Sequence, residues 1–279
     1  MSRILKKREI VPGIFEFEVE NPQIASKALP GHFVIVMPEE SGERIPLTIA
    51  DSDAKAGTIT LVMMVVGAST LKLSRLEEGS HFFALLGPLG QPSHMENFGT
   101  VILVAGGVGA APIHPIAKKL KQAGNKVITI HGAKNADLLI WEDKLRAWSD
   151  EYITTTDDGS QGIKGLVTMP LKEFLANDVN RDIRRVFAIG PTIMMKFCSE
   201  TTRPFEVSTT VSLNNLMVDG TGMCGGCRVK VGTKTMFTCT DGPEFEGHDV
   251  DWNTALFRGK IYTEHEKCSW NRHLAEVKA

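Results

Sequence analysis

Val101-Ile102-Leu103-Val104-Ala105-Gly106-Gly107-Val108-Gly109-Ala110-Ala111-Pro112 is the stretch that decides the fold. A short apolar run leads into a glycine-rich turn, and a helical pattern then continues to Gln122 and ends at Gly124. Glycines let the backbone approach a phosphate closely, and the first N–H groups of the helix can bind it. Glycine also serves in tight turns that bind nothing, and Pro112 stands where the dinucleotide fingerprint has its third glycine. The context favours a nucleotide, with predicted contacts at Gly106, Gly107, Val108, Gly109 and Pro112.

Strands and helices alternate downstream of this turn. Apolar runs at 127–131, 152–156 and 186–189 predict strands, and the stretches 137–148 and 192–200 predict helices. Such alternation is typical of a doubly wound parallel α/β sheet, which binds ligands at the carboxyl ends of its strands. Gly190 and Pro191 follow the strand at 186–189 and are therefore predicted to join the nucleotide site.

The N-terminal third of the chain has a different pattern. Short β-branched runs at 14–19, 33–37, 58–66 and 82–86 are separated by glycine and proline turns, which predicts an antiparallel barrel or sandwich. The stretch 67–76 is the main helical candidate within it. The tail beyond Phe205 is rich in Gly, Cys, Asp and Thr and shows little helical period. We therefore expect three regions, at 1–97, 98–205 and 206–279.

Two motifs in the β-rich region can contact a phosphorylated cofactor. Arg44-Ile45-Pro46-Leu47-Thr48 offers a guanidinium and a hydroxyl, and Val66-Gly67-Ala68-Ser69-Thr70 precedes the expected helix. Taken separately, the first motif is more typical of a surface arginine, and the second of an ordinary helix cap at Ser69 or Thr70.

The cysteines are concentrated near the C-terminus. The plant-type 2Fe–2S pattern is C-x4-C-x2-C with a fourth cysteine further on. Cys224, Cys227 and Cys239 fit its last three places, and Asp219 occupies the first. Three interpretations follow: Asp219 is the fourth ligand, Cys268 completes the set, or the site holds a structural zinc. The predicted metal ligands are Asp219, Cys224, Cys227 and Cys239, whereas Cys198 is expected to be a buried small hydrophobe.

Composition excludes several classes of function. The formal net charge is -2, and the sequence has no Lys/Arg block that would indicate nucleic-acid binding. We expect no membrane span, because the longest apolar run is the length of a strand. The first residues do not read as a signal peptide. The five cysteines argue against a disulfide framework. We therefore expect a cytoplasmic protein.

The order of these motifs resembles the ferredoxin–NADP reductase superfamily, a flavin-binding barrel followed by a nicotinamide-binding domain. The cysteine tail is similar to that of dihydroorotate dehydrogenase electron-transfer subunits, and more so to the small (alpha) subunits of NADH-dependent ferredoxin:NADP oxidoreductases, which are known for an aspartate at the place of Asp219. The resemblance implies that regions 1–97, 98–205 and 206–279 bind FAD, NAD(H) and a 2Fe–2S cluster. The FAD contacts that it implies are Arg44, Pro46, Leu47, Thr48, Val62, Gly67, Ser69 and Thr70.

The resemblance also implies a function and a partner. Hydride would be exchanged between NAD(H) and FAD, and single electrons would pass through the cluster to a larger subunit that carries a second flavin and 4Fe–4S clusters and serves ferredoxin. No acid–base residue is required. The alternatives are a dihydroorotate dehydrogenase subunit, for which Asp219 is unexpected, and a zinc-stabilised binding module. NAD is preferred over NADP by resemblance only, since Lys134 suits a 2′-phosphate and Asp137 a ribose hydroxyl.

Overall fold

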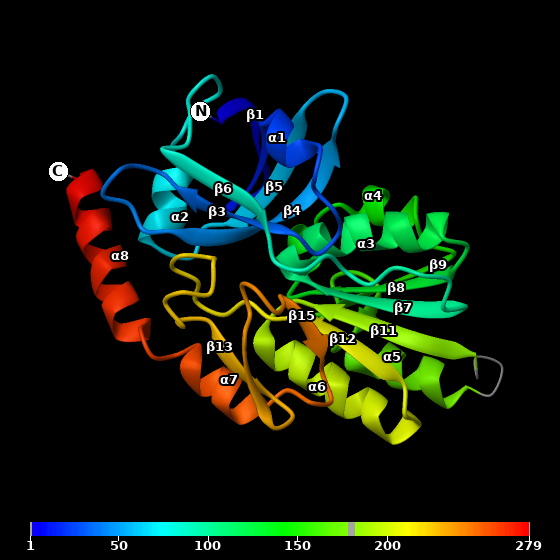
Figure 1. The fold of residues 1–279 in the computed structure, drawn as a ribbon. Helices are drawn as coiled ribbons and strands as arrows, with labels where there is room; N and C mark the ends of the chain where they lie inside the picture. Colours follow the sequence, from blue (N-terminus) through cyan, green and yellow to red (C-terminus); the bar gives the residue numbers. More distant parts are fainter. Residues whose placement is uncertain (1, 178–181, 279) are drawn as a thin grey trace.

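The computed structural model describes residues 2–177 and 182–278, which form a β-barrel, a parallel sheet with helices and a C-terminal region (Figure 1). The strands are β1 Arg3–Val11, β2 Ile14–Glu20, β3 Phe33–Met37, β4 Ile45–Asp53, β5 Thr58–Met64, β6 Ala84–Leu89, β7 Thr100–Gly106, β8 Lys126–Ala133, β9 Glu151–Thr156, β10 Ile163–Lys164, β11 Ile183–Ile189, β12 Ser208–Ser212, β13 Arg228–Val231, β14 Lys234–Phe237 and β15 Glu244–Glu246. The α-helices are α1 Pro22–Ala25, α2 Ala68–Leu73, α3 Ala110–Gln122, α4 Glu142–Arg146, α5 Thr168–Ala176, α6 Thr192–Thr202, α7 Trp252–Arg258 and α8 Thr263–Lys278. Short 3₁₀ turns are η1 Gly107–Gly109, η2 Ala136–Leu138 and η4 Arg203–Phe205.

The N-terminal strands form one antiparallel sheet in the order β1-β2-β5-β4-β3-β6. A bridge between Arg3 and His81 brings the first strand next to the segment before β6, so the sheet curls on itself. Alternate side chains such as Phe17, Val34 and Leu61 fill its interior. The predicted antiparallel fold of this region is confirmed.

The second sheet has the order β10-β9-β8-β7-β11-β12-β15, parallel throughout except for β15. Every residue of β7 is buried, as expected for a central strand covered on both faces. Val101 and Leu103 pack in the cluster that includes α3, whereas Ile102 and Val104 pack with residues of α5 and α6. These helices lie on opposite faces of the sheet (Figure 1), which confirms the predicted doubly wound domain.

One predicted helix is wrong. The stretch 137–148 is divided into η2 and α4 because Trp141 adopts a left-handed conformation with φ 57°. L-residues rarely adopt this conformation unless their surroundings constrain them. The helical spacing of apolar residues in this stretch was therefore not enough to predict its backbone.

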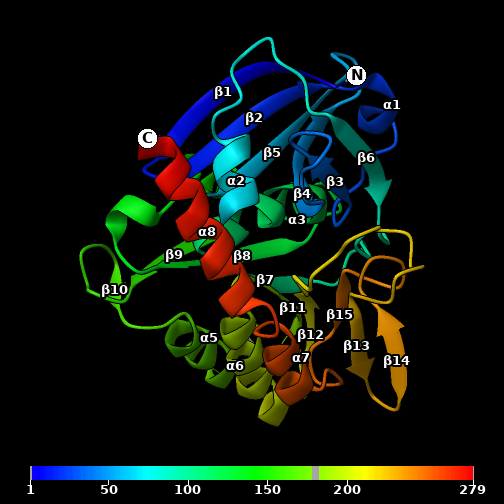
Figure 2. The same cartoon turned by 90° about the vertical axis from the view of Figure 1, so that its left-hand side faces the viewer.

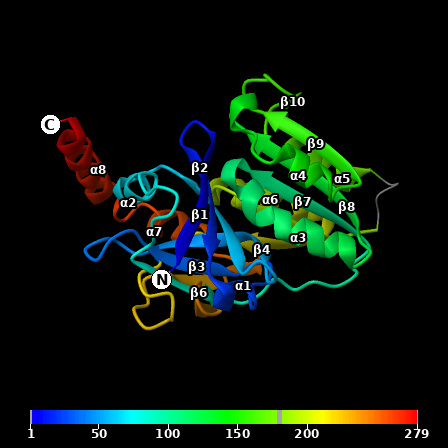
Figure 3. The ribbon, with the colours of Figure 1, turned by 90° about the horizontal axis from the view of Figure 1, so that it is seen from above.

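The prediction of little helix in the tail is also wrong. Its first strand, β12, continues the parallel sheet beside β11, and β15 adds an antiparallel edge. The tail then ends in α7, which begins at an Asp251 cap that accepts the N–H of Thr254, and α8. Figure 2 shows α8 beside α2 of the barrel, which it contacts. Seen from above, α8 lies at the left edge of the molecule, away from the parallel sheet (Figure 3).

Candidate functional site

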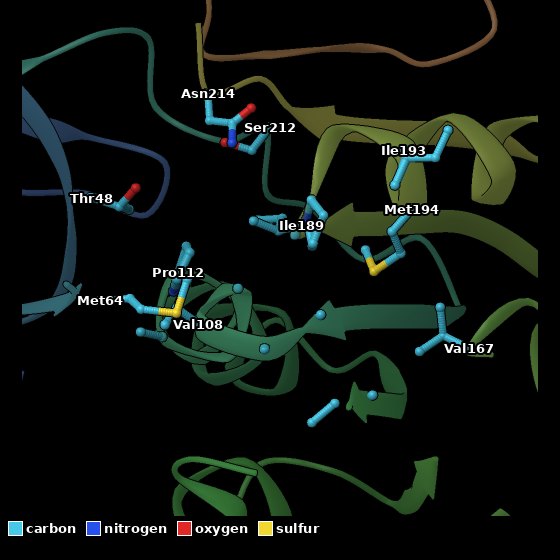
Figure 4. Close-up of a pocket in the computed structure, with 18 of the residues that line it drawn as sticks. Thr48, Met64, Val108, Pro112, Val167, Ile189, Ile193, Met194, Ser212 and Asn214 are labelled. Atoms are coloured by element: carbon cyan, nitrogen blue, oxygen red, sulfur yellow. The ribbon is translucent and has the colours of Figure 1, made fainter. Parts of the chain in front are cut away.

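The barrel and the parallel sheet enclose a cavity of about 940 Å³ between them (Figure 4). The carboxyl ends of the parallel strands open into it, which is where such sheets bind ligands. Its wall is mostly apolar, with a small number of polar side chains, as is typical of cofactor sites. The predicted contacts that line it are Pro46, Leu47, Thr48, Val62, Gly106, Gly107, Val108, Gly109, Pro112, Gly190 and Pro191.

The glycines of the first turn have different roles. A Cβ on Gly106 would lie 2.4 Å from the sulfur of Met194, and one on Gly109 would lie 2.1 Å from the Ile189 carbonyl oxygen. Gly109 therefore requires glycine, because the Ile189 backbone cannot move aside, whereas a larger residue at Gly106 would require the Met194 side chain to shift. Gly107 has φ 54°, and a Cβ there would meet no atom within 4 Å. Gly107 is thus the glycine that leaves backbone open toward the cavity, as close approach of a pyrophosphate requires.

The two glycine turns touch each other. β11 lies beside β7, and a Cβ on Gly190 would lie 3.0 Å from the Cα of Gly106. The helix α3 begins at Ala110, two residues before Pro112, so the free N–H groups of its first turn lie next to the contact. This arrangement gives the cavity a floor of backbone that an elongated phosphate-containing ligand can lie against.

Four predicted flavin contacts lie outside the cavity lining. The Ser69 hydroxyl donates to the Glu43 carboxylate at 2.7 Å. The Thr70 hydroxyl accepts the backbone N–H of Gly67 at 3.0 Å and caps α2. The Arg44 guanidinium contacts the sulfur of Met37 at 3.3 Å. The structure therefore gathers these residues near the start of α2, apart from the glycine turns.

Two charged residues line the cavity, and the sequence had pointed to only one of them, Lys134. Lys134 follows β8 and Asp157 follows β9, and both line the cavity. Asp137, which was the expected partner of a ribose hydroxyl, is not among the lining residues. Applying the rule of carboxyl strand ends to the run Thr154-Thr155-Thr156-Asp157 would have found this aspartate.

The cysteine loop brings two of its thiols together. The sulfurs of Cys227 and Cys239 lie 3.3 Å apart, and both residues are buried. Burial and the neighbouring Cys227 raise the pKa of the Cys239 thiol to about 12. Cys224 is exposed on the same loop. Two sulfurs at this separation suit two corners of one tetrahedral metal atom, whose charge would favour the thiolate forms.

Asp219 lies at the start of the loop and organises it. Its carboxylate accepts the N–H of Thr221 at 3.0 Å and of Cys224 at 2.8 Å. The bond from Thr221, with help from Cys224, holds the pKa of the Asp219 carboxyl below its usual value. Asp219 is therefore an ionised oxygen donor next to Cys224, whereas Cys268 is exposed on α8.

The sulfurs also receive backbone hydrogen bonds. The Gly226 N–H donates to Cys224 at 3.4 Å, and the Cys239 N–H donates to Cys227 at 3.4 Å. Such bonds stabilise cluster thiolates and tune their potential. Within residues 2–177 and 182–278, no group of three or more His, Cys, Asp or Glu side chains is arranged to hold a metal ion. The sulfur pair, its N–H donors and the adjacent carboxylate nevertheless have the chemistry of an iron–sulfur site.

The cysteine pair and the cavity share a wall. Phe33 and Met217 line the cavity and also pack in the small apolar cluster that contains Cys227 and Cys239. The loop itself rests on the barrel, since a Cβ on Gly220 would lie 2.8 Å from Ile35 and from Leu89. Phe33 and Met217 thus belong both to the cavity wall and to the apolar cluster that contains the buried thiols.

Comparison with known proteins agrees with this geometry. Residues 103–200 match the oxidoreductase NAD-binding domain, and residues 214–251 match the iron–sulfur cluster binding domain of dihydroorotate dehydrogenase B. The chain is 47% identical over 274 residues to a dihydroorotate dehydrogenase B (NAD(+)) electron transfer subunit homolog from Thermotoga maritima, covering 98% of this chain and 96% of that protein. The chain belongs to this electron-transfer subunit family. It is an oxidoreductase subunit by that membership.

Other members and neighbours extend the comparison. The electron transfer subunit from Streptococcus thermophilus is 34% identical over 253 residues, covering 87% of this chain and 94% of the relative. A solved structure of an NADH-dependent reduced ferredoxin–NADP oxidoreductase, studied for flavin-based electron bifurcation, is 46% identical with a TM-score of 0.92, covering 98% of both chains. A ferredoxin NADP+ reductase from Neisseria gonorrhoeae with bound FAD and NADP, at 17% identity and a TM-score of 0.60, covers 74% of this chain and 90% of its own and shares the fold.

No helix in the part of the chain that the structure describes is both long enough and apolar enough to cross a bilayer.

Proposed function

We propose that this chain is an electron-transfer subunit that exchanges hydride between NAD(H) and FAD and passes single electrons through a 2Fe–2S cluster to a larger partner subunit. The observation that carries the proposal is the shared wall: Phe33 and Met217 border both the cavity and the thiols of Cys227 and Cys239. Two redox sites that share wall residues are suited to electron exchange.

The cofactors supply the redox chemistry, and the flavin is the group that converts between two-electron and one-electron transfer. The protein supplies binding and orientation. Gly107 and the start of α3 offer backbone to a pyrophosphate, and Thr48 and Val62 line the barrel side of the same cavity. The apolar wall excludes water from the region between the two sides.

The cluster ligands that we propose are Asp219, Cys224, Cys227 and Cys239. The support is the 3.3 Å separation of one sulfur pair and the position of the ionised Asp219 beside Cys224. An oxygen ligand in place of a thiolate would change the potential of the cluster. We further propose that Arg44, Gly67, Ser69 and Thr70 contact FAD where it extends beyond the cavity, toward the start of α2.

The partner is proposed from the relatives. They are named electron transfer subunits, and the neighbour with 46% identity is a reductase studied for electron bifurcation. We propose a larger subunit that carries a second flavin and 4Fe–4S clusters and reacts with ferredoxin. A dihydroorotate-oxidising partner is the second candidate, because the curated relatives carry that name.

Anaerobic purification tests the proposal. We expect bound FAD, iron and labile sulfide, and a paramagnetic signal from the cluster after NADH is added. Zinc without iron, together with no flavin absorbance, would contradict it. Co-purification of the untagged partner from the native source, followed by assays with ferredoxin and with dihydroorotate, separates the two partner candidates.

A further inference from the structure

His131 lies at the carboxyl end of β8, directly beside the nucleotide turn. The parallel register pairs His131 with Ala105 and Gly132 with Gly106, so the histidine lies beside the strand residue two positions before Gly107. Its side chain is completely buried. A polar ring at this position, in a strand whose other residues are mostly apolar, needs a physical reason.

One ring nitrogen of His131 has a partner and the other does not. Nδ1 lies 2.8 Å from the Tyr152 hydroxyl, and the two rings meet edge to face at 6.2 Å. Nε2 is buried and has no hydrogen-bond partner in the described part of the chain. Buried polar atoms without a partner are rare, and each one calls for an explanation.

The protonation state of the ring follows from its surroundings. Burial lowers the pKa of His131 to about 4, so at neutral pH the ring carries a single N–H. If the Tyr152 hydroxyl donates to Nδ1, that proton resides on Nε2. The Gly107 backbone raises the pKa of His131 and so partly offsets the effect of burial. Gly107 is therefore near the ring, although no hydrogen bond from Nε2 is formed within the described part of the chain.

Gly107 is the residue whose backbone is open toward the cavity, with φ 54° and no atom near its missing Cβ. A donor placed behind its carbonyl would fix the orientation of the adjoining peptide groups. We propose that His131 is a positioning residue of the dinucleotide site. Its Nε2 N–H, which has no partner among the described residues, donates to the Gly107 carbonyl when the pyrophosphate binds and so holds the glycine turn in the geometry that receives it. This inference rests on the proposed binding of NAD(H).

Substitutions at His131 and Tyr152 test the role of the hydrogen bond. His131→Leu fills the space without an N–H, whereas His131→Gln places an amide N–H near the position of Nε2. Tyr152→Phe removes the hydroxyl that fixes the tautomer. His94→Leu is the matched control, because that histidine is exposed and pairs with Glu96. Each protein is checked for FAD content and for the spectrum of the reduced cluster.

Affinity for NADH and ring nitrogen NMR are the measurements. We expect His131→Leu to raise the Kd for NADH roughly 3- to 10-fold, with FAD and cluster signals unchanged. We expect His131→Gln and His94→Leu to remain close to wild type, and Tyr152→Phe to give a smaller rise than His131→Leu. In wild-type protein with ¹⁵N-labelled histidine, we expect Nε2 of His131 to be protonated. Its resonance should shift when NAD+ is added.

Several results overturn the inference. One is a His131→Leu protein that binds NADH as well as wild type, and another is a His131→Gln protein as weak as His131→Leu. If His131→Leu fails to fold, two other results would count against the inference. One is a wild-type Nε2 resonance that does not change when NAD+ is added, and the other is a Tyr152→Phe protein with an unaltered Kd for NADH. Wild-type protein that holds FAD but does not bind NADH would instead overturn the proposed function, and this inference with it.

Discussion

The indole N–H of Trp141 donates to the carboxylate of Glu16 at 2.7 Å and so ties α4 of the nucleotide domain to β2 of the barrel. Lys144 joins the contact, with its ammonium 3.3 Å from Glu16 and 3.5 Å from the centre of the Trp141 ring. The cost of the left-handed backbone at Trp141 is offset by these interactions. They hold the two walls of the cavity together on the side of α4.

Trp141→Phe keeps most of the ring and removes the N–H donor. We expect it to lower the free energy of unfolding by about 1–3 kcal/mol, since it leaves the partly buried Glu16 carboxylate with fewer partners. Chemical denaturation followed by flavin release measures this. Trp148→Phe, in the same apolar cluster, is the control and should change stability less. Equal losses in both variants would show that ring packing, not the hydrogen bond, matters.

The identity of the fourth cluster ligand can be tested directly. We expect Asp219→Ala to lose most of its iron and Cys268→Ala to retain it, because Asp219 lies beside Cys224 whereas Cys268 is exposed on α8. Asp219→Cys should keep iron and shift the reduction potential, because a thiolate replaces an oxygen donor. Iron and sulfide analysis with redox titration gives the answer. Loss of iron from Cys268→Ala alone would reverse the assignment.

Nucleotide preference is predicted to depend on Asp157, which lines the cavity at the end of β9. A carboxylate accepts a bond from a ribose hydroxyl and repels a 2′-phosphate. We expect Asp157→Asn to reduce the preference for NADH over NADPH roughly tenfold, measured as the ratio of kcat/KM with an artificial acceptor. Asp137→Asn removes the same charge outside the cavity lining and should leave the ratio unchanged. A larger effect of Asp137→Asn would refute this assignment.

Glu244 introduces a pH dependence of stability. Burial raises the pKa of its carboxyl to about 7, although the Ser93 hydroxyl donates to it at 2.6 Å. Because the folded form holds this proton more tightly than the unfolded chain does, stability should fall as pH rises from about 4.5 to about 7. Glu244→Gln should flatten that part of the curve, and the exposed Glu200→Gln should not. Thermal unfolding at several pH values measures this, and an unchanged slope in Glu244→Gln would contradict it.

The glycines of the nucleotide turn should respond differently to alanine. At Gly109 the new Cβ would lie 2.1 Å from the Ile189 carbonyl oxygen, so we expect a loss of several kcal/mol of stability or failure to fold. At Gly107 there is space, and the cost should be about 1–2 kcal/mol from the positive φ. Gly107→Ala should nevertheless weaken NADH binding. Denaturation and NADH titration separate the two effects, and the opposite ranking of stabilities would contradict the packing analysis.

Local sequence patterns were sufficient to predict the two sheets and many of the residues that line the cavity. The apolar run Val101–Ala105 in β7 predicted a buried strand. The glycine turn that follows it was therefore expected at the carboxyl end of that strand. The split of the helix at Trp141 could not be foreseen, because it depends on Glu16, which is distant in sequence. The edge strand β15 likewise exists only through its pairing with β12.

The cysteine spacing predicted a metal-type site but not its surroundings. That Phe33 would line the cavity and also pack beside Cys227 and Cys239 depends on how the tail folds against the barrel. The role proposed for His131 was also not predicted, since a single histidine in an apolar strand is usually structural. Its unpartnered Nε2 is visible only in three dimensions.

Because β12 and β15 of the C-terminal region complete the sheet of the nucleotide domain, this region is not an interchangeable module. Truncation after residue 205 would leave β11 with an unpaired edge, and a chimera joined there would pair β11 with a strand from the other parent. A chimera that also replaced β3 would change the surface on which the cysteine loop packs. Recombination within the family should therefore succeed mainly when the barrel strand, the sheet edge and the cysteine loop are inherited together from one parent.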